Sequence, residues 1–106
     1  MTLDEKLKLA KDPNTIKDIL TTLSKDKDWV VRTHVAENPN ILIDTLIELS
    51  KDENHYVRGR VAENPNTLIE ILKLLSKDKY WEVRFNVAKN SNTPKDMLIE
   101  FSKSED

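Results

Sequence analysis

The sequence predicts an all-α fold built from tandem helical repeats, and three observations lead to this prediction. The 106 residues include one glycine, four prolines and 34% charged residues, a balance typical of helical globular domains. Short segments carry apolar residues at the spacing of one helix face. These segments recur every 26 residues, and a period of that size is typical of repeat proteins. We therefore expect a single domain, residues 1–106, that forms a helical-repeat solenoid.

Columns of identical residues define the repeat. A serine recurs at positions 24, 50, 76 and 102, and an alanine recurs at positions 10, 36, 62 and 88. A Val-Arg pair recurs at positions 31–32, 57–58 and 83–84. About four units are expected: residues 1–23 as an N-terminal cap and partial repeat, residues 24–49, 50–75 and 76–101 as repeats, and residues 102–106 as a C-terminal tail.

The first expected helix covers residues 3–10. Thr2 precedes it and Glu5 follows three residues later, which is the pattern of a capping box. This helix is expected to cap the N-terminal end of the array.

A short helix is expected next in every unit. Its buried face is predicted by apolar residues at i, i+3, i+4 and i+7, as in Ile16, Ile19, Leu20 and Leu23, with Leu42 and Leu68 as the equivalents of Ile16. The expected caps are Thr15, Thr67 and Thr93, each three residues before a carboxylate, with Asn40 in the unit that has Ile41 instead and Pro94 in the first turn of the last helix. Stacking of neighbouring helices is expected to cover the isoleucines outside this stripe: Ile43, Ile47, Ile69 and Ile99.

A second helix completes each unit, from Asp28 to Glu37 and at the equivalent positions. Val31 and Val35 face inward on this helix, and Trp29 packs near its start. The helix ends at Asn38-Pro39-Asn40, because the residue before a proline is disfavoured in the helical conformation. Short turns then make the paired helices antiparallel neighbours.

A known pattern carries the same residues. From Leu9 to Ser102 the motif L-x-x-L-S-K-D-x-x-x-x-V-R-x-x-V-A-x-N-P-N-T resembles the leucine-rich repeat variant, a helical relative of the HEAT and armadillo repeats. The resemblance implies a right-handed solenoid whose units are α/α or α/3₁₀ pairs. Some relatives bind an iron-sulfur cluster through cysteines, and this chain has none, so we expect no cofactor.

The resemblance also implies a structural role for charged residues. In HEAT-type repeats an Asp and an Arg six residues apart form a hydrogen-bonded ladder between successive repeats. The residues with that spacing here are Asp26, Arg32, Asp52, Arg58, Asp78 and Arg84. The ladder is expected to lapse at the ends, where Lys6 stands in the arginine column and Ser104 in the aspartate column.

The sequence favours a protein without enzymatic activity. It has no H-E-x-x-H motif, no glycine-rich phosphate loop and no cysteine nucleophile. His34 and His55 occupy different columns of the repeat, so a surface role is favoured over a metal site. The N-terminus has no apolar core of a secretion signal, and a cytoplasmic location is expected.

Variation on the second helices indicates a partner-binding surface. The positions expected to be exposed and variable are Val30, Thr33, His34, Glu37, Tyr56, Gly59, Arg60, Glu63, Glu82, Phe85, Asn86 and Lys89. The candidate binding residues are Tyr56, Arg60, Trp81, Phe85, Asn86 and His34, because such side chains anchor interfaces. The alternative is ordinary solvated surface with Trp29 and Trp81 as packing residues.

We therefore expect a protein-interaction module or scaffold with a protein or peptide partner. The rival function is a nucleic-acid-binding HEAT-like protein, which the net charge of -2 disfavours. No membrane partner is expected. The chain could also be a piece of a longer array.

Overall fold

The computed structural model describes residues 1–103, and in this range the chain is all-helical without strands, as predicted. Its eight helices are α1 (Leu3–Lys11), α2 (Lys17–Leu23), α3 (Trp29–Glu37), α4 (Ile43–Leu49), α5 (His55–Glu63), α6 (Ile69–Leu75), α7 (Trp81–Lys89) and α8 (Lys95–Ser102). All eight are α-helices, so the 3₁₀ alternative does not occur within residues 1–103. The expected tail, residues 102–106, begins with the last residue of α8 and lies mostly outside the described residues.

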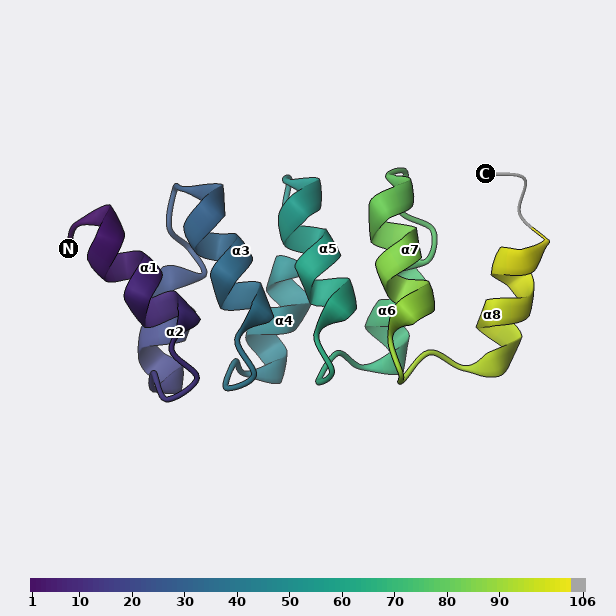
Figure 1. The fold of residues 1–106 in the computed structure, drawn as a ribbon, viewed down its shortest axis with the longest axis horizontal. Helices are drawn as coiled ribbons and strands as arrows, with labels where there is room; N and C mark the ends of the chain where they lie inside the picture. The colour runs from purple at the N-terminus through teal and green to yellow at the C-terminus, as the bar shows by residue number, and fades with distance from the viewer. Residues whose placement is uncertain (104–106) are drawn as a thin grey trace.

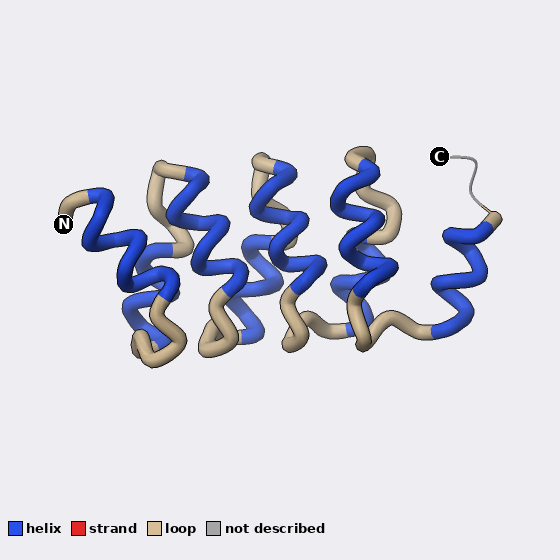
Figure 2. Tube along the Cα trace, viewed as in Figure 1, coloured by secondary structure: helices blue, strands red, loops and turns tan. Residues whose placement is uncertain are grey.

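Helices α1, α3, α5 and α7 stand side by side in one row, with α2, α4 and α6 behind it (Figure 1). The body measures 47 × 20 × 17 Å. Short turns connect the helices (Figure 2). Each helix of the row packs against the next, so the row presents one continuous surface.

The core between the two layers is aliphatic. Each of α3, α5 and α7 contributes two fully buried valines, and α2, α4 and α6 each contribute two buried leucines. Burial of one such side chain stabilises the fold by about 1.5 to 3 kcal/mol relative to its exposure to water. No aromatic residue belongs to this core in residues 1–103.

The second helix of each unit follows the prediction closely. α3 runs from Trp29 to Glu37, and the side chain of its N-cap residue, Asp28, accepts a hydrogen bond from the backbone N–H of Val30. The predicted capping box of α1 is also confirmed, because Thr2 and Glu5 exchange both of its hydrogen bonds.

The predicted caps of the short helices are wrong. The N-cap residues are Ile16, Leu42, Leu68 and Pro94, and none of these caps through its side chain. The threonines expected as caps lie one residue before the observed N-cap: Thr15, Thr67 and Thr93. Their hydroxyl groups instead donate to backbone carbonyls of the preceding helix, those of Leu9, Val61 and Val87 respectively. Asn40 likewise caps no helix, since its side chain donates to the carbonyl of Thr15.

Because each short helix begins one residue later than expected, the first residue of the expected apolar stripe lies outside the helix. Ile16, Leu42 and Leu68 are extended N-cap residues, and they are exposed rather than buried. The expected covering of Ile43, Ile69 and Ile99 is also wrong, because all three are exposed. The short helices pack mainly against the row, so their outer sides remain open.

Candidate interaction surface

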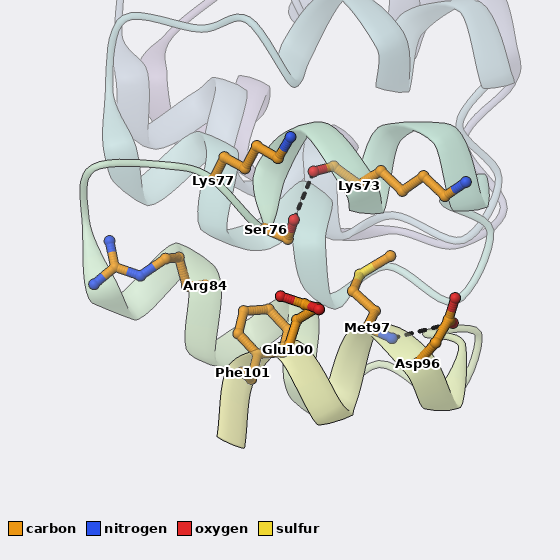
Figure 3. A pocket seen from close by; sticks show the side chains of 8 residues that line it. All are labelled: Lys73, Ser76, Lys77, Arg84, Asp96, Met97, Glu100 and Phe101. Carbon is orange, nitrogen blue, oxygen red and sulfur yellow. Dashed lines mark hydrogen bonds between the residues drawn. The ribbon is translucent and has the colours of Figure 1, made fainter. Parts of the chain in front are cut away.

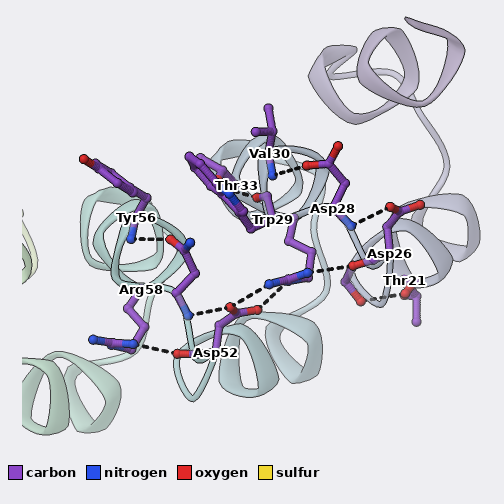
Figure 4. A network of polar contacts seen from close by, with 12 residues as sticks. Thr21, Asp26, Asp28, Trp29, Val30, Thr33, Asp52, Tyr56 and Arg58 are labelled. Carbon is purple, nitrogen blue, oxygen red and sulfur yellow. Dashed lines mark hydrogen bonds and ion pairs between the residues drawn. The ribbon is translucent and has the colours of Figure 1, made fainter. Parts of the chain in front are cut away.

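A ladder of ion pairs holds successive units together (Figure 4). The Nε and Nη2 atoms of Arg32 donate to the two carboxylate oxygens of Asp52 in the next unit, at 2.7 and 3.1 Å. The Nη1 atom of Arg32 donates to the backbone carbonyl of Asp26 in its own unit, at 2.8 Å. Arg32 therefore contacts the aspartate six residues earlier through that residue's backbone and the aspartate twenty residues later through its side chain.

The next rung repeats this geometry. Arg58 binds the carboxylate of Asp78 at 2.7 and 3.2 Å and the carbonyl of Asp52 at 2.7 Å. Arg84 donates to the carbonyl of Asp78 at 2.6 Å. The side chains of Arg58 and Asp78 are only 13% and 8% exposed, so this pair is largely shielded from water.

The ladder does not lapse at Lys6 as the sequence suggested. The ammonium group of Lys6 binds the carboxylate of Asp26 at 2.7 Å, in the way that Arg32 binds Asp52. Lys6 occupies the arginine position of the repeat and keeps the ion pair with the aspartate twenty residues later. It lacks only the two parallel hydrogen bonds that a guanidinium group makes to a carboxylate. Ser104, the other expected end of the ladder, lies outside the described residues.

Ladder contacts shift the pKa values of Asp26, Asp78 and Arg32. The hydrogen bond from Lys6, followed by that from the N–H of Asp28, holds the pKa of Asp26 below its ordinary value. Burial works to raise the pKa of Asp78, but the hydrogen bonds from Arg58 and from the Tyr80 N–H outweigh it, so this pKa is also lowered. The hydrogen bond to Asp52 raises the pKa of Arg32. These shifts are those of charged structural pairs.

A second ladder, made of asparagines, was missed by the sequence reasoning. The side-chain amide of Asn64, which is buried, donates to the carbonyl of Ala36 at 2.8 Å and to that of Asn38 at 3.4 Å, both in the preceding unit. Asn38 and Asn90 make the equivalent bonds one unit earlier and one unit later. The recurring Asn-Pro-Asn motif was the available signal, although it suggested a local turn rather than a bond between units.

Aromatic side chains gather on the row helices. We call Trp29, Tyr56, Tyr80, Trp81 and Phe85 the aromatic face; each is between 36% and 60% exposed. Trp29 stacks on Tyr56 at 5.3 Å between ring centroids, and His55 bridges Tyr56 and Tyr80 at 4.3 and 4.1 Å. The ring of Trp81 meets the edge of Phe85 at 5.8 Å. Trp81 is 60% exposed, which is more than a packing residue requires.

Polar candidate residues form a chain across the same helices. His34 lies 3.6 Å from the carboxylate of Glu37, and Arg60 bridges Glu37 at 3.4 Å and Glu63 at 2.6 Å. Asn86 donates to Glu63 at 3.3 Å and to the carbonyl of Gly59 at 3.1 Å.

The structure thus links His34, Arg60 and Asn86 through carboxylates across three units. Two positions that were expected to be exposed on this side, Thr33 and Gly59, are instead buried. Gly59 faces α7, where its carbonyl accepts a hydrogen bond from the side chain of Asn86, and the hydroxyl of Thr33 donates to the carbonyl of Trp29 in its own helix.

A pocket of about 470 Å³ lies towards the C-terminal end of the chain, among α6, α7 and α8 (Figure 3). Met97 and Phe101 give it an apolar side. Its charged lining is mixed: Lys73, Lys77, Arg84, Asp96 and Glu100. Acids and bases of similar number give this pocket no clear preference for a charged ligand.

No group of three or more His, Cys, Asp or Glu side chains in residues 1–103 is placed to hold a metal ion. None of the helices in this range combines the length and the apolar character that crossing a bilayer requires. Comparison with protein-family models, with curated proteins and with solved structures found no match for the chain.

Proposed function

We propose that the chain is a non-enzymatic protein-interaction module of the leucine-rich repeat variant type, a right-handed solenoid related to HEAT and armadillo repeats. The 26-residue period, the two-layer arrangement of paired helices and the two ladders between units support the repeat assignment. A cytoplasmic location is part of the proposal and fits a sequence without cysteine.

The observation that carries the proposal is the position of the aromatic residues. The sequence has six Phe, Trp and Tyr residues, and five of them form the aromatic face. The sixth, Phe101, packs against the core, and the buried core cluster of residues 1–103 contains no aromatic ring. A large ring in water forgoes much of the stabilisation that burial would bring. Exposed Trp and Tyr side chains are also the commonest anchors of protein interfaces. A partner that covers the rings explains both facts.

Ligand capture with a matched pair of variants tests this function. The wild-type chain, the double variant Tyr56→Ala/Trp81→Ala and the control Leu74→Ala are immobilised and exposed to native lysate, and bound proteins are compared by mass spectrometry. Leu74 is 64% exposed on α6 and lies outside the aromatic face, so it controls for loss of any exposed apolar side chain. We expect a protein retained by the wild type and the control and lost with the double variant. Identical capture by all three chains would contradict the proposal.

A further inference from the structure

The C-terminal end of the two-layer body is uncovered within residues 1–103. α7 is the last helix of the row there, and only α8 follows it (Figure 1). We call four exposed side chains at this end the end face: Trp81, Phe85, Lys89 and Leu98. We infer that the end face binds the same face of a second copy of the chain, with the two α7 helices antiparallel. The inference goes beyond the proposed function, which concerns a different protein as the partner.

Burial at equivalent positions of the preceding units shows that the end face lacks a neighbour. Leu98 is 40% exposed, whereas the leucines at its position are at most 1% exposed: Leu20, Leu46 and Leu72. Phe85 is 51% exposed, whereas Thr33 and Gly59 at its position are buried. Ala88 is partly exposed, whereas the other alanines of its column are fully buried: Ala10, Ala36 and Ala62. In the preceding units the next unit covers these positions, because each row helix packs against the next.

α5 shows how a helix is received at this kind of face. His55 lies 3.6 Å from the carboxylate of Glu82 on α7. The side-chain nitrogen of Asn86 donates to the carbonyl of Gly59 and to the carboxylate of Glu63. These three positions of α5 are occupied on α7 by Trp81, Phe85 and Lys89. They are four residues apart, so their side chains lie along one side of α7 and continue the interface between units.

A two-fold axis at the level of Phe85 makes this line of side chains complementary to itself. Trp81 and Lys89 lie four residues before and after Phe85, about 6 Å along the helix in each direction. In the antiparallel pair the two Phe85 rings meet at the centre, and each Trp81 ring faces Lys89 of the other copy. Tryptophan is the most favourable ring for a cation–π contact. The ammonium of Lys89 already lies 5.0 Å from the centroid of the Phe85 ring in its own chain.

The charges at this end allow the antiparallel pair. The two copies of Lys89 lie about 12 Å apart along the paired helices, farther than the screening length of about 8 Å at physiological salt. The other charged side chains of α7 contact their own chain, since Glu82 lies 3.6 Å from His55 and Arg84 donates to the carbonyl of Asp78. α8 and its C-cap residue add two acids and two bases: Lys95, Asp96, Glu100 and Lys103.

Head-to-tail stacking, with α1 of one copy on the end face of another, is disfavoured by charge. Glu37 stands at the position of Lys89 in an earlier unit, and it receives Arg60 of the next row helix at 3.4 Å. The residue of α1 at the position of Arg60 is Lys8, so this stacking brings two ammonium groups together. α1 also presents an exposed carboxylate on the same side, that of Asp4. A two-fold pair avoids both, and two-fold dimers are the commonest homo-oligomers.

The size of the end face sets the expected strength of the dimer. The body is only 20 × 17 Å across, so an interface at its end is smaller than the about 800 Å² per partner of a standard complex. Interfaces of this size are typical of weak, transient association. We expect a dissociation constant on the order of 10 to 100 μM.

Sedimentation equilibrium of the full chain, from about 5 μM to about 1 mM, tests the inference. We expect the average mass to rise from that of one chain towards that of two chains and no further. Phe85→Glu should weaken the dimer at least about tenfold, because it places two carboxylates at the centre of the interface. Ile43→Glu is the matched control, since Ile43 is an apolar residue, 39% exposed, on α4 in another unit, and it should leave the dimer unchanged.

Lys89→Glu separates the two-fold dimer from head-to-tail stacking. It removes the cation that faces Trp81 of the other copy, so it should weaken the dimer about fivefold or more. In a head-to-tail stack the same substitution would pair with Lys8 and strengthen association. Lys89 is exposed, and circular dichroism checks that each variant keeps its helical fold. If Phe85→Glu unfolds, Trp81→Ala takes its place, with the same expected loss.

Four results overturn the inference. These are a mass of one chain at every concentration, a dimer unchanged in Phe85→Glu or its replacement, a dimer unchanged in Lys89→Glu, and masses above two chains that increase in Lys89→Glu. The last of these favours head-to-tail stacking instead. The proposed function is decided separately by lysate capture, so a monomeric chain whose capture depends on Tyr56 and Trp81 keeps that function and loses only the dimer.

Discussion

Arg58 shows how a single residue can hold two repeats together. Its guanidinium binds the Asp78 carboxylate of the following unit and the Asp52 carbonyl of its own unit. Replacement by alanine leaves a poorly hydrated carboxylate without its partner. We expect Arg58→Ala to lower the free energy of unfolding by about 3 to 5 kcal/mol, against about 0 to 1 kcal/mol for Lys51→Ala, whose side chain is exposed. Urea denaturation measures both, and equal shifts of the midpoint would show that the ladder is not a structural strut.

Asn64 is the matching test of the asparagine ladder. Its buried amide satisfies two carbonyls of the preceding unit, and its side-chain oxygen accepts the N–H of Asn66. Because Asn64→Ala leaves these buried groups without partners, we expect it to cost about 1 to 3 kcal/mol. Asn66→Ala is the control, since Asn66 is exposed and its side chain donates one hydrogen bond to the carbonyl of Pro39. Thermal unfolding should give a clearly lower melting temperature for Asn64→Ala than for Asn66→Ala. The reverse order would contradict a structural role for Asn64.

At the scale of the element, the two kinds of helix differ in how well the sequence predicts them. Helices α3 and α5 were predictable because an aspartate or asparagine cap and an Asn-Pro stop lie directly beside their ends. The short helices were misplaced at their start by one residue, because Thr15 and Thr67 have the composition of caps but bond backwards to the preceding helix. That choice depends on contacts with another element, which a local pattern does not contain.

For the candidate binding residues, too, the sequence predicted positions but not the contacts between units. Repeat columns placed Tyr56 and Trp81 on the row helices, and this placement needed only the period. The stack of Trp29 on Tyr56 and the bridge of Arg60 between two glutamates join residues of different units. Such contacts depend on the offset between neighbouring helices, which the sequence alone does not determine.

Gly59 offers a test of packing between row helices. It lies inside α5, where glycine is unfavourable, and a Cβ atom added there would meet the side-chain nitrogen of Asn86 at 3.4 Å, an ordinary contact. We therefore expect Gly59→Ala to stabilise the fold by about 0.5 to 1 kcal/mol through helix propensity. Thr33→Gly, at the equivalent position of α3, should destabilise the fold, because it places a glycine inside a helix. A lower melting temperature for Gly59→Ala would mean that α5 and α7 pack too closely for a methyl group.

At the scale of the whole molecule, the bonds of the two ladders recur in register from unit to unit, so a unit should be removable. Deletion of residues 50–75 joins Leu49 to Ser76, and Arg32 then faces Asp78 in the place of Asp52. Asn90 then faces Ala36 as Asn64 did. We expect a shorter folded helical protein with a lower melting temperature, because one interface is lost. Far-UV circular dichroism without a helical signal would contradict this nearest-neighbour picture.

Binding to duplex DNA is the property that separates the two functional classes. A protein that grips duplex DNA typically neutralises about 6 to 10 phosphates, and its affinity falls steeply with salt. The exposed lysines of the turns are the main basic source: Lys25, Lys27, Lys51, Lys77 and Lys79. The ladder aspartates among them already bind Lys6, Arg32 and Arg58, so they cancel these lysines less than their position in the sequence suggests.

Five lysines still fall short of such a footprint, and the part-exposed carboxylates of the row helices, on Glu37, Glu63 and Glu82, oppose phosphate. We therefore expect a dissociation constant for duplex DNA on the order of 10⁻⁴ M or weaker at physiological salt, the range of non-specific contact. Fluorescence anisotropy with a labelled duplex, repeated over a salt series, measures it. Micromolar binding with a steep salt dependence would favour the nucleic-acid function instead. Lys25→Ala, Lys51→Ala and Lys77→Ala would then each be expected to reduce the salt slope by about one, because each removes one phosphate contact.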